Sequence, residues 1–300
     1  MKAKVLFKIL SSFSFVVFSA IILGLVTGGY PAYTNEIAMV ALIVAMIFSL
    51  SSISLKGISK RESLRYGIYS IALNFGLLSA IIIMISFLFK EELKLGFVIM
   101  ASVPTAIAVI PITKILGGKM DHAFVSISLI YLSSLIFTPV FVLVFLGKNV
   151  DISRLIYDII LLIVVPLILS RFIRRVKIPD NASRSIANLC FFLLIFGIMG
   201  KNRSFLFCEL GNILLLSIVL FFRTFVIGSL VFEIGRRMRI SKDKLVLLSL
   251  FSSFKNEGIA ILLCLSLLPK EISYIATIPC VLAIIFEMGW AGYLEIRAKR

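Results

Sequence analysis

The sequence predicts an all-α integral membrane protein with ten transmembrane helices, built as two inverted repeats of five, and three observations lead to this fold class. The 300 residues are 60% hydrophobic with a mean hydropathy of +1.11, whereas ordinary soluble domains are about 45–50% apolar. Charged residues fall in short clusters between apolar runs of about 20 residues, the length that a helix needs to cross a bilayer. The runs divide near Asp151 into two sets of five, and because five is odd the second set enters the membrane in the opposite sense.

The spans are read in chain order from the apolar runs. Residues 6–28 form the first span, because the apolar stretch that begins in "MKAKVLFKILSSF" is too long for a cleavable signal peptide. The other nine are predicted at 37–55, 66–89, 94–115, 122–147, 154–174, 183–200, 206–233, 245–268 and 272–294. Residues 1–150 therefore make the first five-helix repeat, and residues 151–300 make the second, inverted repeat.

Basic residues alternate between the two sides of the predicted membrane. Loops on one side carry 22 Lys and Arg residues and loops on the other carry seven, which leaves Arg223 and Lys255 inside spans. Because cytoplasmic loops collect Lys and Arg, both termini are predicted to be cytoplasmic in a multi-pass protein of the cell membrane. The formal net charge of +16 follows from this topology, so we expect the lipid bilayer and no nucleic acid as a partner.

Catalytic and metal-binding patterns are missing from the sequence. The four cysteines have neither metal-like nor redox-like spacing and read as apolar packing residues: Cys190, Cys208, Cys264 and Cys280. The single His122 lies at a loop edge, and no HExxH or paired-aspartate motif occurs. We therefore expect no enzyme and no metal cofactor, and we consider a channel less fitting because no acidic ring or carbonyl-filter motif is present.

Two spans are interrupted at matching depths. The fourth span reads "KLGFVIMASVPTAIAVIPITK", and its Pro104 lies ten residues from both Lys94 and Lys114, about 15 Å from each edge at ~1.5 Å per residue. The ninth span contains "FSSFKNEGIAILL", in which Lys255 lies 151 residues after Pro104, close to half the chain. The two interruptions thus occupy corresponding places in the two repeats, where carriers with inverted repeats bind solutes and ions.

Broken helices in a membrane create a polar site. Pro104 lacks an amide hydrogen and Gly258 favours unwinding, so freed backbone groups need partners other than lipid. Opposed half-helices also direct partial charges into one volume. We therefore predict a site for an ion or an anionic solute, lined by Pro104, Thr105, Lys255, Asn256, Glu257 and Gly258. The plainer alternative is that Pro104 only kinks its span, with Ser102 or Thr105 bonding the freed carbonyl.

Two segments of the chain resemble the bile acid:sodium symporter family. They read "ASVPTAIAVIPITKILGG" with the following "AFVSISLIYLSSLIFTPVFVLVFLG", and "FKNEGIAILLCLSLLPKEISYIATIPCVLAII". The resemblance continues as a ten-span pattern over nearly the whole chain. It implies a core domain, in which the fourth and ninth helices cross, beside a smaller panel domain. It also implies secondary active transport of a small organic anion by alternating access, driven by a sodium gradient.

The sodium site of that family is only partly matched. Asn256 and Gly258 agree with the family's ninth helix, but Lys255 stands where a Gln is typical and Phe251 where an acidic residue is typical. The stretch 106–110 is wholly apolar where the family has a Ser-Asn pair, so most side-chain oxygens for a sodium ion are gone. We hypothesise that Lys255 replaces sodium as a fixed or proton-dependent charge, which would make transport proton-coupled, exchange-type or uncoupled.

Other polar residues inside spans are weaker candidates for the site. Glu257 and Glu287 are candidate counter-charges for Lys255, although Glu287 could also be a carboxylate that reaches the cytoplasmic surface. Arg223, Asn74, Asn188 and Ser128 could line the site, or they could pair with charges and pack helices. Auxin-efflux-type carriers and cation:proton antiporters of related fold remain alternatives, and a homo-oligomer remains open.

Overall fold

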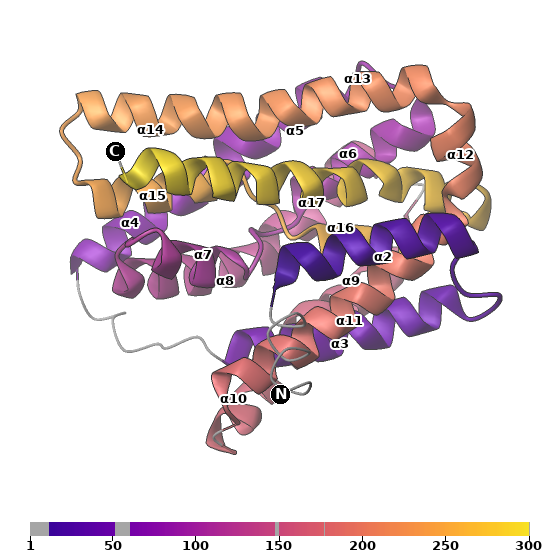
Figure 1. Ribbon diagram of the computed structural model, residues 1–300, viewed down its shortest axis with the longest axis horizontal. Helices are drawn as coiled ribbons and strands as arrows, with labels where there is room; N and C mark the ends of the chain where they lie inside the picture. Colours follow the sequence, from indigo (N-terminus) through magenta and orange to yellow (C-terminus); the bar gives the residue numbers. More distant parts are fainter. Residues whose placement is uncertain (1–11, 52–60, 148–149, 177, 300) are drawn as a thin grey trace.

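The computed structural model describes residues 12–51, 61–147, 150–176 and 178–299, and these residues form helices joined by short connections, without a strand. In chain order the first nine elements are α2 (Phe13–Thr27), α3 (Thr34–Ser51), α4 (Arg61–Ile71), η1 (Ala72–Leu78), α5 (Ser79–Ser86), α6 (Glu91–Ser102), α7 (Val109–Ile115), α8 (Met120–Leu146) and α9 (Ile152–Ile159). They are followed by η3 (Ile160–Val164), α10 (Val165–Arg175), α11 (Asp180–Lys201), α12 (Arg203–Cys208), α13 (Leu210–Phe221), η4 (Phe222–Val226), α14 (Ile227–Arg237), α15 (Lys242–Phe251), α16 (Glu257–Leu267) and α17 (Lys270–Lys299). Most of the long helices run side by side along the longest axis of the molecule (Figure 1).

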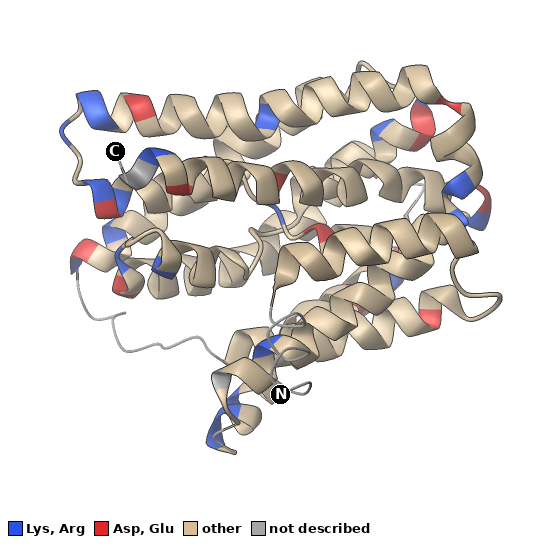
Figure 2. Ribbon diagram, viewed as in Figure 1, with Lys and Arg blue, Asp and Glu red and all other residues tan. Residues whose placement is uncertain are grey.

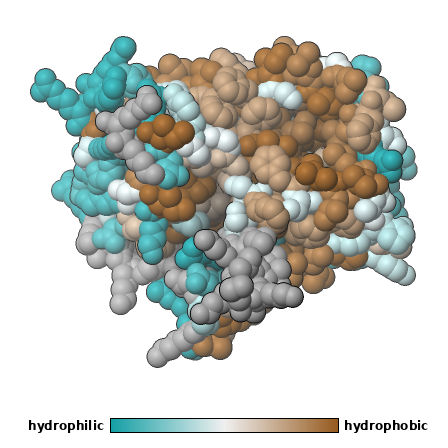
Figure 3. All heavy atoms as spheres, in the orientation of Figure 1, coloured by the Kyte–Doolittle hydropathy of each residue, from teal (hydrophilic) through white to brown (hydrophobic). Residues whose placement is uncertain are grey.

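The described residues contain seven helices that are long and apolar enough to cross a membrane. The shorter helices Phe13–Thr27 and Glu257–Leu267 are also apolar. Charged residues gather at the two ends of the helices, with few between them (Figure 2), and apolar side chains cover the zone between these ends (Figure 3). The all-α membrane class is therefore confirmed, whereas ten crossings and an inverted repeat stay predictions.

Several predicted features lie outside the described residues. These are residues 6–11 of the first span, residues 52–55 of the second span, and eight basic residues of the loop count: Lys2, Lys4, Lys8, Lys56, Lys60, Lys148, Lys177 and Arg300.

Three long helices contain a π-helical segment that the sequence reading did not predict. Each is formed by consecutive elements: α4, η1 and α5; α9, η3 and α10; and α13, η4 and α14. A π-helical turn inserts an extra residue and shifts backbone hydrogen bonding from i+4 to i+5, which frees polar groups in the middle of a helix. Such segments are frequent at functional sites.

The helices pack as two groups. In the first group α11 lies against α2 and α3, and α10 lies against α3. In the second group α6 contacts α5, α8, α16 and α17, while α4 packs on α8 and α14 packs on α15. The groups meet chiefly where α16 touches α3 and α9 and where α17 touches α11.

A glycine sets the close approach of α6 to α17 in the second group. A Cβ added at Gly96 would lie 2.0 Å from the backbone oxygen of Ala276, a distance that no side chain permits. Because the obstructing atom belongs to the backbone of α17, it cannot turn aside. Gly96 therefore lets the first interrupted helix lie directly on α17, and this contact helps to position the break that follows α6.

Candidate functional site

The two interruptions meet in the middle of the second group of helices. Helix α6 ends at Ser102 and α7 begins at Val109, and α15 ends at Phe251 with α16 beginning at Glu257. Val103 has the extended backbone (φ −84°, ψ 157°) that the residue before a proline favours, so the sequence itself ends α6 there. The amide of Asn256 donates a 2.7 Å hydrogen bond to the carbonyl of Pro104, which joins the two breaks directly.

Lys255 extends from the second break into a cage of oxygen atoms at the first. Its side chain is fully buried. Its Nζ lies near four neutral acceptors: Ser79 Oγ at 2.9 Å, Val103 O at 2.9 Å, Ala101 O at 3.0 Å and Asn74 Oδ1 at 3.2 Å. The ring of Phe75 lies 4.8 Å from Nζ and adds a cation–π contact. The ammonium thus binds the carbonyl end of α6, the negative end of that half-helix.

Asn74 ties the third predicted span to the second break. Its Nδ2 donates to the carbonyls of Phe251 (3.2 Å) and Phe254 (3.0 Å), which lie where α15 ends, and its Oδ1 accepts from Lys255. Asn74 belongs to η1, and the hydroxyl of Ser79 donates to its backbone oxygen at 3.0 Å. The π-helical turn therefore places Asn74 and Ser79 on the same side, facing the two unwound segments.

Arg223 forms a second buried group of charges. One guanidinium nitrogen, Nη2, donates to Glu257 Oε1 at 2.7 Å and to Glu287 Oε1 at 2.8 Å, and all three residues are buried. Arg223 lies in η4, Glu257 opens α16 and Glu287 lies in the middle of α17. Glu287 is 2% exposed and lies away from the surface, so the alternative of a carboxylate reaching the cytoplasmic surface does not describe it.

The two groups of charges touch through the backbone. The amide of Lys255 donates to Glu287 Oε1 at 3.0 Å, although none of the ion pairs between described residues involves the Lys255 side chain. Glu257 and Glu287 thus bind Arg223, while the Lys255 ammonium is held by neutral oxygens. The formal charges of the four side chains sum to zero. This division of partners could not be read from one sequence, because it depends on how each helix is rotated.

Several buried polar atoms around these charges have no protein partner among the described residues. They are Thr105 Oγ1, Thr224 Oγ1, Glu257 Oε2, Trp290 Nε1, and Arg223 Nε and Nη1. Native proteins satisfy most buried polar atoms, so a group of them indicates capacity for a polar ligand or for water. The site therefore combines two basic side chains, a carboxylate pair and unused hydrogen-bonding groups.

Asn256 and Gly258 link the breaks to neighbouring helices. Asn256 begins α16 as its N-cap, accepting from the amide of Ile259, and donates to Tyr131 Oη at 2.7 Å. Gly258 lies in the first turn of α16, not in the unwound segment where we expected it to act. Its role is spatial, because a Cβ there would lie 2.7 Å from a methyl of Leu42 on α3. Gly258 therefore lies where the two groups of helices meet.

Two further predicted residues, Ser128 and Asn188, lie on α8 and α11. Ser128 is partly buried and bonds the carbonyl of Phe124 in its own helix. Asn188 is buried on α11, in the first group of helices. Sequence reasoning missed Ser79 and Tyr131, and the signal available for Ser79 was its spacing of five from Asn74, which matches a π-helical turn. The described residues contain no group of three or more His, Cys, Asp or Glu side chains that could hold a metal ion.

Comparison with known proteins identifies one family. Residues 11–294 match the model of the SBF-like CPA transporter family, which covers nearly the whole chain and confirms the resemblance to bile acid:sodium symporters. No curated protein matches the sequence.

Proposed function

The chain belongs to the SBF-like CPA transporter family, and from this premise we propose that it is a secondary active transporter of a small organic anion that works by alternating access. A family of membrane transporters agrees with the apolar helices and with the expectation that the chain is not an enzyme. The substrate class and the coupling are our proposal.

The observation that carries the proposal is the oxygen cage around Lys255. A sodium ion needs several oxygen ligands, and the four oxygens of this cage already surround Lys255 Nζ at 2.9–3.2 Å. The lysine thus takes the place of a cation that would otherwise have to enter from solution. We propose that this carrier needs no sodium ion, because the Lys255 side chain supplies a fixed or proton-dependent charge in the ninth span.

The four buried charges of the site limit which ion can move together with the organic anion. Lys255 and Arg223 offset Glu257 and Glu287, so a carboxylate that enters the site brings one negative charge without a protein counter-charge. Uncompensated charge is costly inside a membrane. We propose that the cargo is accompanied by a proton or exchanged for a second anion, either of which keeps the transported charge balanced.

Repeated spacings support the proposed inverted repeat of residues 1–150 and 151–300. Segments η1 and η4 begin 150 residues apart, at Ala72 and Phe222, and α8 and α17 begin 150 residues apart, at Met120 and Lys270. Helices α6 and α15, which precede the two breaks, begin 151 residues apart. We propose ten crossings on this basis, with the two interrupted helices each counted as one span. The first group of helices then corresponds to the panel domain and the second to the core domain.

A binding screen tests the proposal. Purified protein is heated with a series of small mono- and dicarboxylates, and the change in Tm is compared for wild type, Lys255→Gln and the surface control Lys270→Gln. We expect a subset of carboxylates to raise the Tm of wild type and of Lys270→Gln but not of Lys255→Gln. An identical response in Lys255→Gln would mean that the lysine has only a structural role, and a response to no carboxylate would contradict the substrate class.

A cation:proton antiporter of related fold is the second candidate. The pair of buried carboxylates, Glu257 and Glu287, favours it, because such an antiporter needs acidic groups for which a proton and a metal cation compete. Acid-loaded vesicles containing a pH-sensitive dye distinguish the two functions. Antiport predicts that external Na⁺ or K⁺ raises the internal pH without any organic anion, whereas the anion carrier predicts no response to either cation.

A further inference from the structure

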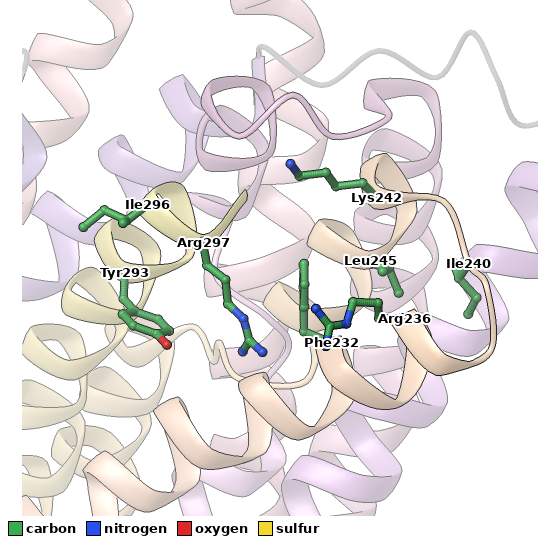
Figure 4. A pocket seen from close by; sticks show the side chains of 8 residues that line it. All are labelled: Phe232, Arg236, Ile240, Lys242, Leu245, Tyr293, Ile296 and Arg297. Carbon is green, nitrogen blue, oxygen red and sulfur yellow. The ribbon is translucent and has the colours of Figure 1, made fainter. Parts of the chain in front are cut away.

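A pocket with a volume of about 520 Å³ opens at one end of the second group of helices, away from the buried charges. It lies between the end of α14, the start of α15 and the last turns of α17 (Figure 4). Its lining residues are Phe232, Arg236, Ile240, Lys242, Leu245, Tyr293, Ile296 and Arg297. By the distribution of Lys and Arg, this is the predicted cytoplasmic end.

The polar side of the pocket is basic. Arg236 and Arg297 both donate to Glu233, with nitrogen–oxygen distances of 2.5 and 2.9 Å, so one carboxylate holds two guanidinium groups in place. Lys242 takes part in none of the ion pairs between described residues. The three cations and one carboxylate leave a formal excess of two positive charges. Such a site favours an anion that accepts several hydrogen bonds, and phosphate has this character.

The other side of the pocket is apolar, and part of it is exposed. Ile296 is 60% exposed and Tyr293 is 46% exposed on α17. Phe232 of α14 and Leu245 of α15 complete this apolar lining. A free phosphate ion would gain nothing from these apolar neighbours. An amphipathic anion would bury apolar surface against them while its charge met the basic residues.

We propose that this pocket binds the phosphate group of an anionic phospholipid, with its acyl chains lying along the exposed apolar residues Tyr293 and Ile296 of α17. The basic side chains contact the phosphate where the cytoplasmic leaflet carries its anionic lipids. Ile240 and Leu245 belong to the pocket and flank the start of α15, the helix that leads into the second break. A bound lipid therefore steadies the end of the interrupted span.

The first test is lipid retention measured by native mass spectrometry of the detergent-solubilised protein. Phosphatidylglycerol and phosphatidylcholine are titrated against wild type, Lys242→Gln, the pair Lys242→Gln/Arg297→Gln, and the charge-matched pair Arg237→Gln/Arg239→Gln. Arg237 and Arg239 are exposed near the pocket but do not line it. We expect wild type to prefer phosphatidylglycerol, and the preference to fall about fivefold for each cation lost from the pocket. We expect the Arg237/Arg239 pair to change it less than twofold.

Three results would overturn the proposal. These are equal retention of the two lipids by wild type, an equal loss in the Arg237/Arg239 control, and displacement of phosphatidylglycerol by inorganic phosphate or glycerol phosphate at similar concentrations. The last result would show that the basic residues recognise a soluble phosphate. Arg297 also binds Glu233, so a folding defect in the double variant is separated from lipid binding by the single variant Lys242→Gln, whose side chain lacks such an ion pair among the described residues.

Discussion

Arg223 illustrates, at the scale of single residues, how charge is accommodated between apolar helices. Its guanidinium is fully buried, and its Nη2 binds carboxylates from two different helices at 2.7 and 2.8 Å. An unpaired charge at this depth would be costly, and a paired one becomes costly when one partner is removed. Arg223, Glu257 and Glu287 therefore stabilise the fold only together, because removing one of them leaves a buried charge without its partner.

Replacing Arg223 with an uncharged residue should lower the stability of the protein. Arg223→Gln leaves Glu257 and Glu287 facing each other without a cation, and we expect a loss of about 3–5 kcal/mol in the free energy of unfolding. The triple variant with Glu257→Gln and Glu287→Gln should recover part of that loss, because no buried carboxylate then lacks its arginine partner. Denaturant or thermal unfolding in detergent measures both. A triple variant less stable than Arg223→Gln would contradict this electrostatic account.

The sequence identified these charged residues but not their partners. Lys255, Glu257, Glu287 and Arg223 are recognisable because charged side chains inside apolar runs are rare. Their pairing was not predictable, since one sequence does not give the rotation of each helix. Ser79 offered only its spacing of five from Asn74, a weaker signal, because serine in an apolar helix more often supports close packing.

At the scale of elements, the sequence predicted where the two helices are interrupted, from Pro104 in one span and from the polar residues around Lys255 in the other. Pro104 ends α6 through the extended conformation of Val103, and the residues around Lys255 separate α15 from α16. The π-helical segments were not predicted, because they arise from tertiary contacts and leave little trace in hydropathy. Gly258 was recognised as important for the wrong reason: it gives room to Leu42 and does not unwind the helix.

The close contact between α6 and α17 at Gly96 can be tested by substitution. Gly96→Ala would place a methyl group against the backbone oxygen of Ala276, so α6 and α17 must separate, and we expect a loss of more than about 2 kcal/mol in stability together with loss of transport. Gly292→Ala is the matched control, because α17 has open space there and alanine favours a helix by up to about 1 kcal/mol. Equal Tm values for the two variants would show that the α6–α17 contact is not tight.

At the scale of the whole molecule, two groups of helices meet over a limited set of contacts. One contact joins Arg154 of α9 to Ser266 at the end of α16, with Nε donating to the hydroxyl at 2.7 Å. Asp158 lies 3.6 Å from the same guanidinium and is fully buried. Alternating access by movement of one group against the other would break such contacts. The grouping was expected only from the family resemblance, because hydropathy locates spans without saying which of them pack together.

The predicted orientation in the membrane can be tested with a native cysteine. Cys208 is exposed, whereas Cys190, Cys264 and Cys280 are buried. Cys208 ends α12, which lies between α11 and α13 at the end predicted to be non-cytoplasmic. A membrane-impermeant maleimide should therefore label intact cells at Cys208, and Cys208→Ser should abolish the labelling. Labelling that requires permeabilised cells would place this end of the molecule in the cytoplasm and reverse the topology.

The central claim is that Lys255 replaces a transported sodium ion, and flux into proteoliposomes tests it most directly. The solute is the carboxylate that gives the largest Tm increase in the binding screen, offered with an imposed sodium gradient, an imposed proton gradient or an internal counter-anion. We predict that uptake by wild type is unchanged when potassium replaces sodium, rises with the proton gradient or the counter-anion, and is lost in Lys255→Gln. Uptake by wild type that requires a sodium gradient, with one or two ions per solute, would contradict the claim.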